Sequence, residues 1–112
     1  MHELSLCRSI DGIVRRAAQG RPVSVVELAI GELRQVVPET LEHCWSVVSQ
    51  GTELANSRLE VQRIEGVIQC RDCQAKTRLA GQPTLRCGSC SGTVVDIVSG
   101  EEFMVTAVSL EI

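Results

Sequence analysis

Aromatic side chains are almost absent from this sequence of 112 residues, which has one tryptophan, one phenylalanine and no tyrosine. Proteins that bind single-stranded nucleic acid usually stack the bases on aromatic side chains. An excess of positive charge is also missing, since the formal net charge is −3. Proteins that bind nucleic acid through its phosphates generally have a basic surface. We therefore expect no nucleic-acid partner.

Long apolar runs and a secretion signal are missing as well. No stretch approaches the roughly 20 apolar residues that span a bilayer. The opening Met-His-Glu-Leu-Ser is not a basic segment followed by an apolar one, which is the pattern of a secretory signal. We expect a cytoplasmic protein without membrane contact. In a reducing compartment, its six cysteines should bind metal, undergo redox chemistry or lie buried as thiols.

The rest of the sequence predicts an α/β fold. Apolar residues recur at three- and four-residue steps over residues 4–18, and again from Pro38 to about Ser49, so both segments should be amphipathic helices. Aliphatic and β-branched residues predict strands at 23–30, 59–64 and 103–112. We expect two helices on a small mixed sheet of about three strands. The predicted buried stripes are Leu6, Ile10, Ile13, Val14 and Ala17 in the first helix and Leu41, Cys44, Trp45 and Val48 in the second.

The strongest motif is Cys70-Arg-Asp-Cys73, followed after thirteen residues by Cys87-Gly-Ser-Cys90. Two residues between cysteines let both sulfurs meet one ion, and two such pairs form a tetrahedral sulfur cage that suits zinc. The spacing leaves open an iron site of the rubredoxin type and a pair of redox disulfides. A zinc site with four thiolate ligands has no open coordination position, so we expect it to be structural.

A segment of about 35 residues is too short to be stable through its own core, and zinc would supply the missing stability. We therefore predict a zinc-ribbon-like module at 66–100, with a strand at 93–98, inserted between the last two strands of the sheet. The α/β domain would comprise residues 1–65 plus 101–112. Cys7 and Cys44 are expected in the core of that domain, and His43 on its surface.

The N-terminus can bind metal through the backbone as well as through side chains. A free amine of Met1, the amide nitrogen of His2 and the His2 imidazole would close two adjoining chelate rings, with Glu3 as a possible oxygen ligand. Nickel(II) accepts square-planar nitrogen and oxygen ligands, and copper(II) would fit the same site. Because the amine and imidazole must lose protons to bind, nickel affinity should fall as the pH drops from about 8 to 6.

Taken together, these motifs resemble the HypA/HybF family of hydrogenase and urease nickel-incorporation proteins over the full length of the chain. The resemblance rests on Met1-His2-Glu3-Leu4-Ser5, Ile30-Gly31-Glu32, Gly51-Thr52, the two Cys-x-x-Cys pairs and the closing Val108-Ser109-Leu110-Glu111-Ile112.

The resemblance implies a nickel metallochaperone, not an enzyme, that serves the maturation of a nickel–iron hydrogenase or of urease. It implies nickel at His2, with the Met1 amine and Glu3 in support, and zinc at the four cysteines. It further implies a GTPase accessory protein and the hydrogenase large subunit as partners, and allows a homodimer. Some relatives have an aspartate near the start of the second helix, where this chain has Val36-Val37-Pro38-Glu39, so Glu39 competes with Glu3 as the further ligand.

A second class of function also fits the sequence. The chain could be a zinc-ribbon adaptor or regulatory module that binds a protein or nucleic acid and has no role with nickel. An enzyme is not expected, because no nucleophile with its base, no phosphate-binding glycine loop and no acid–base pair is recognisable in the sequence.

Overall fold

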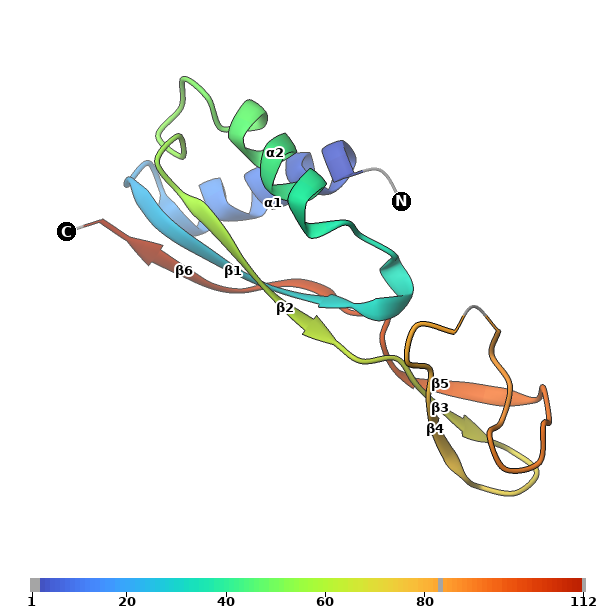
Figure 1. Ribbon diagram of the computed structural model, residues 1–112. Coiled ribbons are helices and arrows are strands. Elements are labelled where there is room, and N and C mark those ends of the chain that lie inside the picture. Colours follow the sequence, from blue (N-terminus) through green and yellow to red (C-terminus); the bar gives the residue numbers. More distant parts are fainter. Residues whose placement is uncertain (1–2, 83, 112) are drawn as a thin grey trace.

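The structure, a computed structural model, describes residues 3–82 and 84–111. The molecule is elongated, with extents of 53 × 22 × 16 Å, and its two sheets lie one after the other along the long axis (Figure 1). In chain order the elements are α1 (Glu3–Ala18), β1 (Val23–Gly31), the 3₁₀ helix η1 (Glu32–Arg34), α2 (Pro38–Val48), β2 (Arg58–Ile64), β3 (Val67–Cys70), β4 (Lys76–Arg78), β5 (Val95–Ser99) and β6 (Phe103–Leu110).

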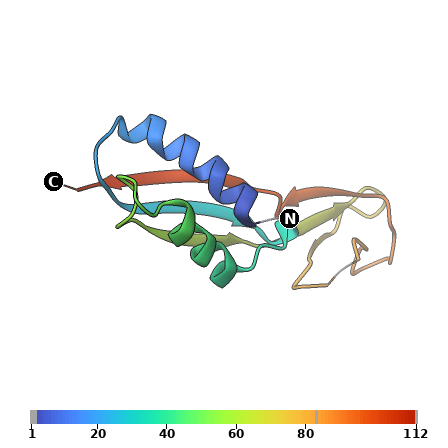
Figure 2. The ribbon, with the colours of Figure 1, turned by 90° about the horizontal axis from the view of Figure 1, so that it is seen from above.

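The first sheet has the strand order β2-β1-β6, with β2 parallel and β6 antiparallel to the central β1. Both α-helices cover the same face of this sheet (Figure 2). The expected two helices on a mixed sheet of three strands are therefore confirmed within the described residues. We call this unit the α/β part; it consists of residues 3–65 and 101–111.

Alternation along β1 places Val26, Leu28 and Ile30 in the core between the helices and the sheet, with at most 4% of each side chain exposed. Trp45 of α2 is buried there as predicted, and its indole N–H donates to the Ser57 hydroxyl at 3.0 Å. An indole donor in a core needs such a partner. The remaining face of the sheet is not covered by a helix in either view (Figures 1 and 2).

The predicted stripe of α1 was partly wrong. Ile13 is 39% exposed and Ala17 is exposed, whereas Cys7 and Ala18 are buried with Leu6, Ile10 and Val14. The helix is rotated toward Cys7 because α2 packs on that side, and a single helix sequence does not show on which side its neighbour lies.

The second sheet has the order β4-β3-β5 and is antiparallel throughout. We call the unit formed by residues 66–82 and 84–100 the cysteine module. The sequence predicted its strand at 93–98, which the structure has as β5, but it did not predict β3 or β4. Those strands are four and three residues long, too short to show a period-two pattern.

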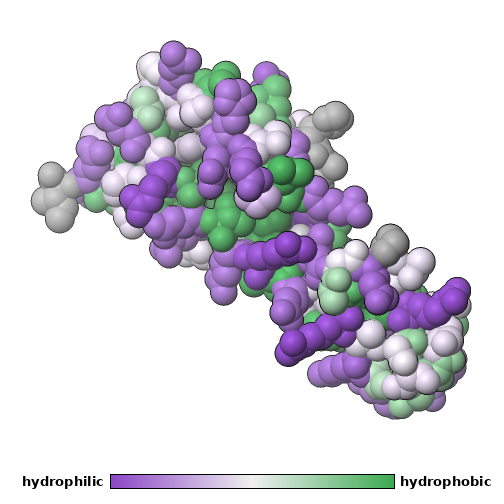
Figure 3. Space-filling view, in the orientation of Figure 1, coloured by the Kyte–Doolittle hydropathy of each residue, from purple (hydrophilic) through white to green (hydrophobic). Residues whose placement is uncertain are grey.

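Two stretches of chain connect the units, from Ile64 of β2 to Val67 of β3 and from Ser99 of β5 to Phe103 of β6. Both lie at the narrow region between the units, where hydrophilic side chains gather on the face seen in Figure 3. None of the described helices is both long and apolar enough to span a bilayer.

Candidate metal centres

The two Cys-x-x-Cys segments adopt the same backbone structure. In the first, the amide of Gln74 donates to the carbonyl of Cys70 at 3.0 Å, and the amide of Cys70 donates to Ala75 at 2.9 Å. In the second, Ser91 donates to Cys87 at 3.0 Å and Cys87 donates to Gly92 at 2.9 Å. Gln74 and Ser91 both have left-handed backbones, with φ of 66° and 61°. The chain thus forms two equivalent turns, each presenting two sulfurs.

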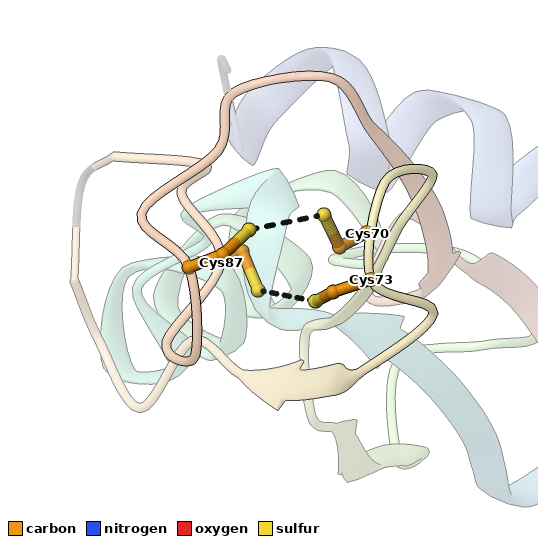
Figure 4. A group of neighbouring side chains, drawn as sticks. Cys70, Cys73 and Cys87 are labelled. Carbon is orange, nitrogen blue, oxygen red and sulfur yellow. Dashed lines mark hydrogen bonds between the residues drawn. The ribbon is translucent and has the colours of Figure 1, made fainter.

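These turns face each other and bring all four sulfurs together (Figure 4). Every pair of sulfurs among Cys70, Cys73, Cys87 and Cys90 lies within 4.8 Å. The closest pairs are Cys73–Cys87 at 3.5 Å and Cys70–Cys90 at 3.6 Å. Tetrahedral zinc with Zn–S bonds of about 2.3 Å separates its sulfurs by about 3.8 Å, whereas a disulfide requires about 2.05 Å. The geometry fits a metal with four thiolate ligands and contains no disulfide among these residues.

The backbone of the second turn favours the thiolate form of one ligand. The amides of Cys90 and Ser89 donate to the Cys87 sulfur and lower the pKa of Cys87 to about 6. At Cys90 the amide of Gly92 has the same effect, but the neighbouring thiols outweigh it and raise the pKa of Cys90 to about 12. Four thiolates this close therefore need a bound cation, and a divalent ion supplies the charge that removes their protons.

Gly92 is required by the sulfur cage. A Cβ at this position would lie 3.2 Å from the Cys90 sulfur and 3.5 Å from the Cys70 sulfur. A side chain here would crowd two ligands at once. The close approach of these two sulfurs therefore accounts for a glycine at this position.

An ion pair that was not predicted from the sequence supports the first turn. Arg71, between Cys70 and Cys73, forms two-pronged hydrogen bonds with Asp96 of β5, the shortest being 2.6 Å. The contact holds the turn against the opposite strand and lowers the pKa of Asp96. Both side chains are more than half exposed, so the pair should contribute little to stability. No local signal could have identified two residues that meet only through the pairing of β3 with β5.

The predicted nickel ligands Met1 and His2 lie outside the described residues. Glu3, the first residue of α1, is half-buried, and its carboxylate accepts a hydrogen bond from the amide of Val37 at 3.3 Å. Val37 directly precedes α2, and Glu39 is exposed in the first turn of that helix. The start of α1 and the start of α2 therefore lie at the same corner of the α/β part.

The two cysteines outside the module lie between the helices. Cys7, one turn after Glu3, is fully buried, and its thiol donates to the carbonyl of Leu41 at 3.4 Å. Burial, followed by the charges of Cys44 and Glu3, raises the pKa of Cys7 to about 11. A thiol that stays protonated is a poor metal ligand. Cys7 packs in the core as predicted, Cys44 is half-buried beside it, and His43 is exposed.

Comparison with known proteins extends over nearly the whole chain. Residues 1–110 match the family described as hydrogenase/urease nickel incorporation, metallochaperone, hypA. A protein of Geotalea uraniireducens named hydrogenase maturation factor HypA is 38% identical over 111 residues, which cover 99% of this chain and all of that protein. The protein of the same name from a Nostoc species is 35% identical, covering 99% of this chain and 96% of its own.

Solved structures show the same fold. The solution structure of the nickel metallochaperone HypA from Helicobacter pylori superposes with a TM-score of 0.70 at 18% identity, covering 98% of this chain and 97% of that one. A second solution structure of a HypA protein gives 0.67 at 19% identity, with coverage of 99% and 97%. At these identities the structures establish the common architecture, while the membership rests on the sequence matches.

Proposed function

This chain belongs to the HypA family of hydrogenase/urease nickel-incorporation metallochaperones, and from that premise we propose that it binds nickel(II) at its N-terminus and delivers it during maturation of a nickel–iron hydrogenase. The chain is accordingly a carrier and not an enzyme. The observation that carries the proposal is the match over residues 1–110, which includes both the Met-His-Glu opening and the two cysteine pairs. An adaptor without a nickel role finds no support in these matches.

The proposed nickel ligands are the Met1 amine, the His2 amide nitrogen and the His2 imidazole, with a carboxylate in support. Glu3 is suited to that supporting role because its side chain already reaches the corner where α2 begins. Glu39 is the alternative, two residues beyond the amide that Glu3 contacts. Few fixed ligands at a chain end also suit a carrier, because nickel must leave by exchange onto another protein.

The zinc ligands that we propose are the four cysteines of the module. Their sulfurs all lie within 4.8 Å of one another, and no position would stay open for nickel or a substrate once zinc is bound. Zinc would therefore shape the module and nickel would be the cargo.

As partners we propose a GTPase accessory protein of the nickel-insertion pathway and the hydrogenase large subunit, all in the cytoplasm. Membership in a family of hydrogenase maturation factors supports work with other maturation proteins. The two named partners and a homodimer go further than that membership and require pull-down and sedimentation measurements.

The test uses the two histidines of the chain. Untagged, zinc-loaded protein, His2→Ala and His43→Ala are titrated with nickel at neutral pH, and zinc content is measured in each. We expect His2→Ala to lose at least tenfold in nickel affinity, since it removes the imidazole and one chelate ring. His43→Ala should bind nickel as the unaltered protein does, because His43 is exposed on α2.

Equal nickel stoichiometry and affinity in all three proteins would remove His2 from the site. Zinc loss in His2→Ala would instead mean that the substitution damages the fold. The same titration on Glu3→Gln and Glu39→Gln identifies the carboxylate ligand, and a repeat between pH 8 and 6 should show affinity falling as the amine and imidazole gain protons.

A further inference from the structure

The two stretches that join the α/β part to the cysteine module touch each other. A Cβ on Gly100, which has a φ of +113°, would lie 2.7 Å from the Cα of Gly66. Because the two connecting stretches lie side by side, they can bend and twist together. The position of the module therefore needs a further contact beyond the connecting stretches.

Glu32, the first residue of η1, supplies a contact of that kind. One carboxylate oxygen accepts the amide of Gly66 at 2.8 Å, and the other accepts the amide of Gly81 at 2.5 Å. Gly66 begins the module, whereas Gly81 lies in the loop that follows β4. A single side chain of the α/β part thus binds two separate segments of the module. We call this set of contacts the Glu32 bridge.

The chemistry of the Glu32 bridge favours a carboxylate. The two N–H donors approach opposite oxygens of the side chain, and among side chains only ionised aspartate and glutamate offer an acceptor on both arms. Only 11% of the Glu32 side chain is exposed, so water competes little for these hydrogen bonds. Hydrogen bonds from the Gly66 and Gly81 amides lower the pKa of Glu32, which keeps the carboxylate charged at neutral pH. Charged acceptors form the stronger hydrogen bonds.

The other hydrogen bonds of this segment hold only the second connecting stretch. Within the described residues, Leu33 donates its amide to Gly100 at 2.8 Å, and Arg34 donates its side-chain Nε to the carbonyl of Glu101 at 2.7 Å. Neither reaches the loop after β4. Beside that loop an open pocket of about 560 Å³ separates the units, which leaves room for movement; it is lined by Glu32, Arg63, Glu65, Arg78, Ala80 and Gly81.

The Glu32 bridge lies close in sequence to the corner where α1 and α2 begin, which is the proposed site of nickel binding. η1 continues directly into residues 35–37, and the amide of Val37 donates to Glu3. The same short segment therefore contacts the module at one end and the start of α1 at the other. The orientation of the module determines which of its surfaces stands beside that corner.

We propose that Glu32 is a positioning residue that holds the cysteine module in one orientation against the α/β part. Without its two hydrogen bonds the module keeps its zinc and its fold but reorients about the two connecting stretches. The proposal concerns the zinc-loaded protein alone, so it stands or fails independently of nickel binding at the N-terminus.

The experiment measures amide residual dipolar couplings in the full-length, zinc-loaded protein, in Glu32→Ala, in Glu32→Gln and in Glu65→Gln as the matched control. Glu65 lies in the same junction, and its carboxylate pairs with Arg78 of the module at 3.5 Å. Both side chains of this pair are more than half exposed, so it should hold the units only weakly, and the control removes one negative charge at the same place. We expect one alignment tensor to fit both units in the unaltered protein and in Glu65→Gln. Both Glu32 variants should need a separate tensor for each unit.

One common tensor with unchanged orientation in Glu32→Ala and Glu32→Gln would overturn the proposal. Loss of zinc or of the module's dispersed amide signals in both variants would overturn it too, because Glu32 would then serve the folding of the module. If Glu32→Ala fails to fold, Glu32→Gln decides, because glutamine keeps the volume of the side chain but offers one acceptor and one donor.

Discussion

At the scale of single residues, Gly31 shows how closely the two units approach. It is the last residue of β1, and a Cβ there would lie only 2.0 Å from the carbonyl oxygen of Gly100. The obstacle is backbone, which cannot rotate away as a long side chain can. The Ile-Gly-Glu sequence around it therefore combines a buried strand end, a close backbone approach and the Glu32 bridge.

We predict that Gly31→Ala lowers the free energy of unfolding by more than about 2 kcal/mol, because the backbone at the junction must shift. Gly12→Ala is the matched control, since Gly12 lies inside α1 with nothing within 4 Å of a new Cβ. Alanine favours a helix interior over glycine by about 0.5–1 kcal/mol, so this variant should be more stable. Urea unfolding of the zinc-loaded proteins measures both, and equal effects would contradict the prediction.

At the scale of elements, much of the α/β part follows from the sequence. Apolar periodicity predicted both helices and the strands β1, β2 and β6 to within a few residues, because each element packs one face on a common core. Ile13 was wrongly predicted to be buried. Its spacing fits the buried stripe, but the packing of α1 against α2 turns it outward. Such a rotation depends on tertiary contacts and has no local signal.

The sequence predicted the metal ligands of the cysteine module but not its strands β3 and β4. Paired cysteines identify themselves through spacing, whereas β3 and β4 are held by pairing and by the sulfur cage more than by their own residues. The Glu32 bridge was also not predictable, since its partners lie 34 and 49 residues away and are backbone amides of glycines. Backbone donors leave no trace in a sequence.

The sequence of strand β6 predicts self-association through this edge of the sheet. It forms one edge of its sheet in the described residues, and its sequence FMVTAVSL contains no charged side chain. Uncharged edges pair readily with other strands, and a lysine blocks such pairing. The side chain of Met104 is 50% exposed. We expect Met104→Lys to weaken self-association, so that the mass measured by sedimentation rises less with protein concentration.

The control for this test is Gln62→Lys on the opposite edge strand β2, which already contains Arg58, Glu60 and Arg63. It should leave self-association unchanged. If both lysine variants behave alike, or if the unaltered protein shows no increase in mass with concentration, β6 is not the contact.

At the scale of the whole molecule, removal of zinc should unfold the cysteine module and leave the α/β part folded. The described residues of the module bury few apolar side chains, chiefly Ile68 and Leu79 beside the cysteines. A unit of this size with so small a core depends on its metal. We predict that a strong chelator collapses the amide dispersion of residues 67–99 while the helices and the β2-β1-β6 sheet keep theirs.

Two-dimensional amide spectra and far-ultraviolet circular dichroism of the same samples test this, with restored spectra on adding zinc as the control for reversibility. Simultaneous loss of all amide dispersion would show one cooperative unit and would contradict the predicted division into 1–65 plus 101–112 and 66–100.

The contact between Gly66 and Gly100 makes the cysteine module a separable part of the chain. Because the backbone leaves the helix-covered sheet and returns to it at neighbouring points, the thiol-rich segment is a side branch whose removal leaves a gap that a few residues can close. A shortened gene joining Ile64 to Phe103 through a brief linker should encode the three-stranded sheet and both helices alone.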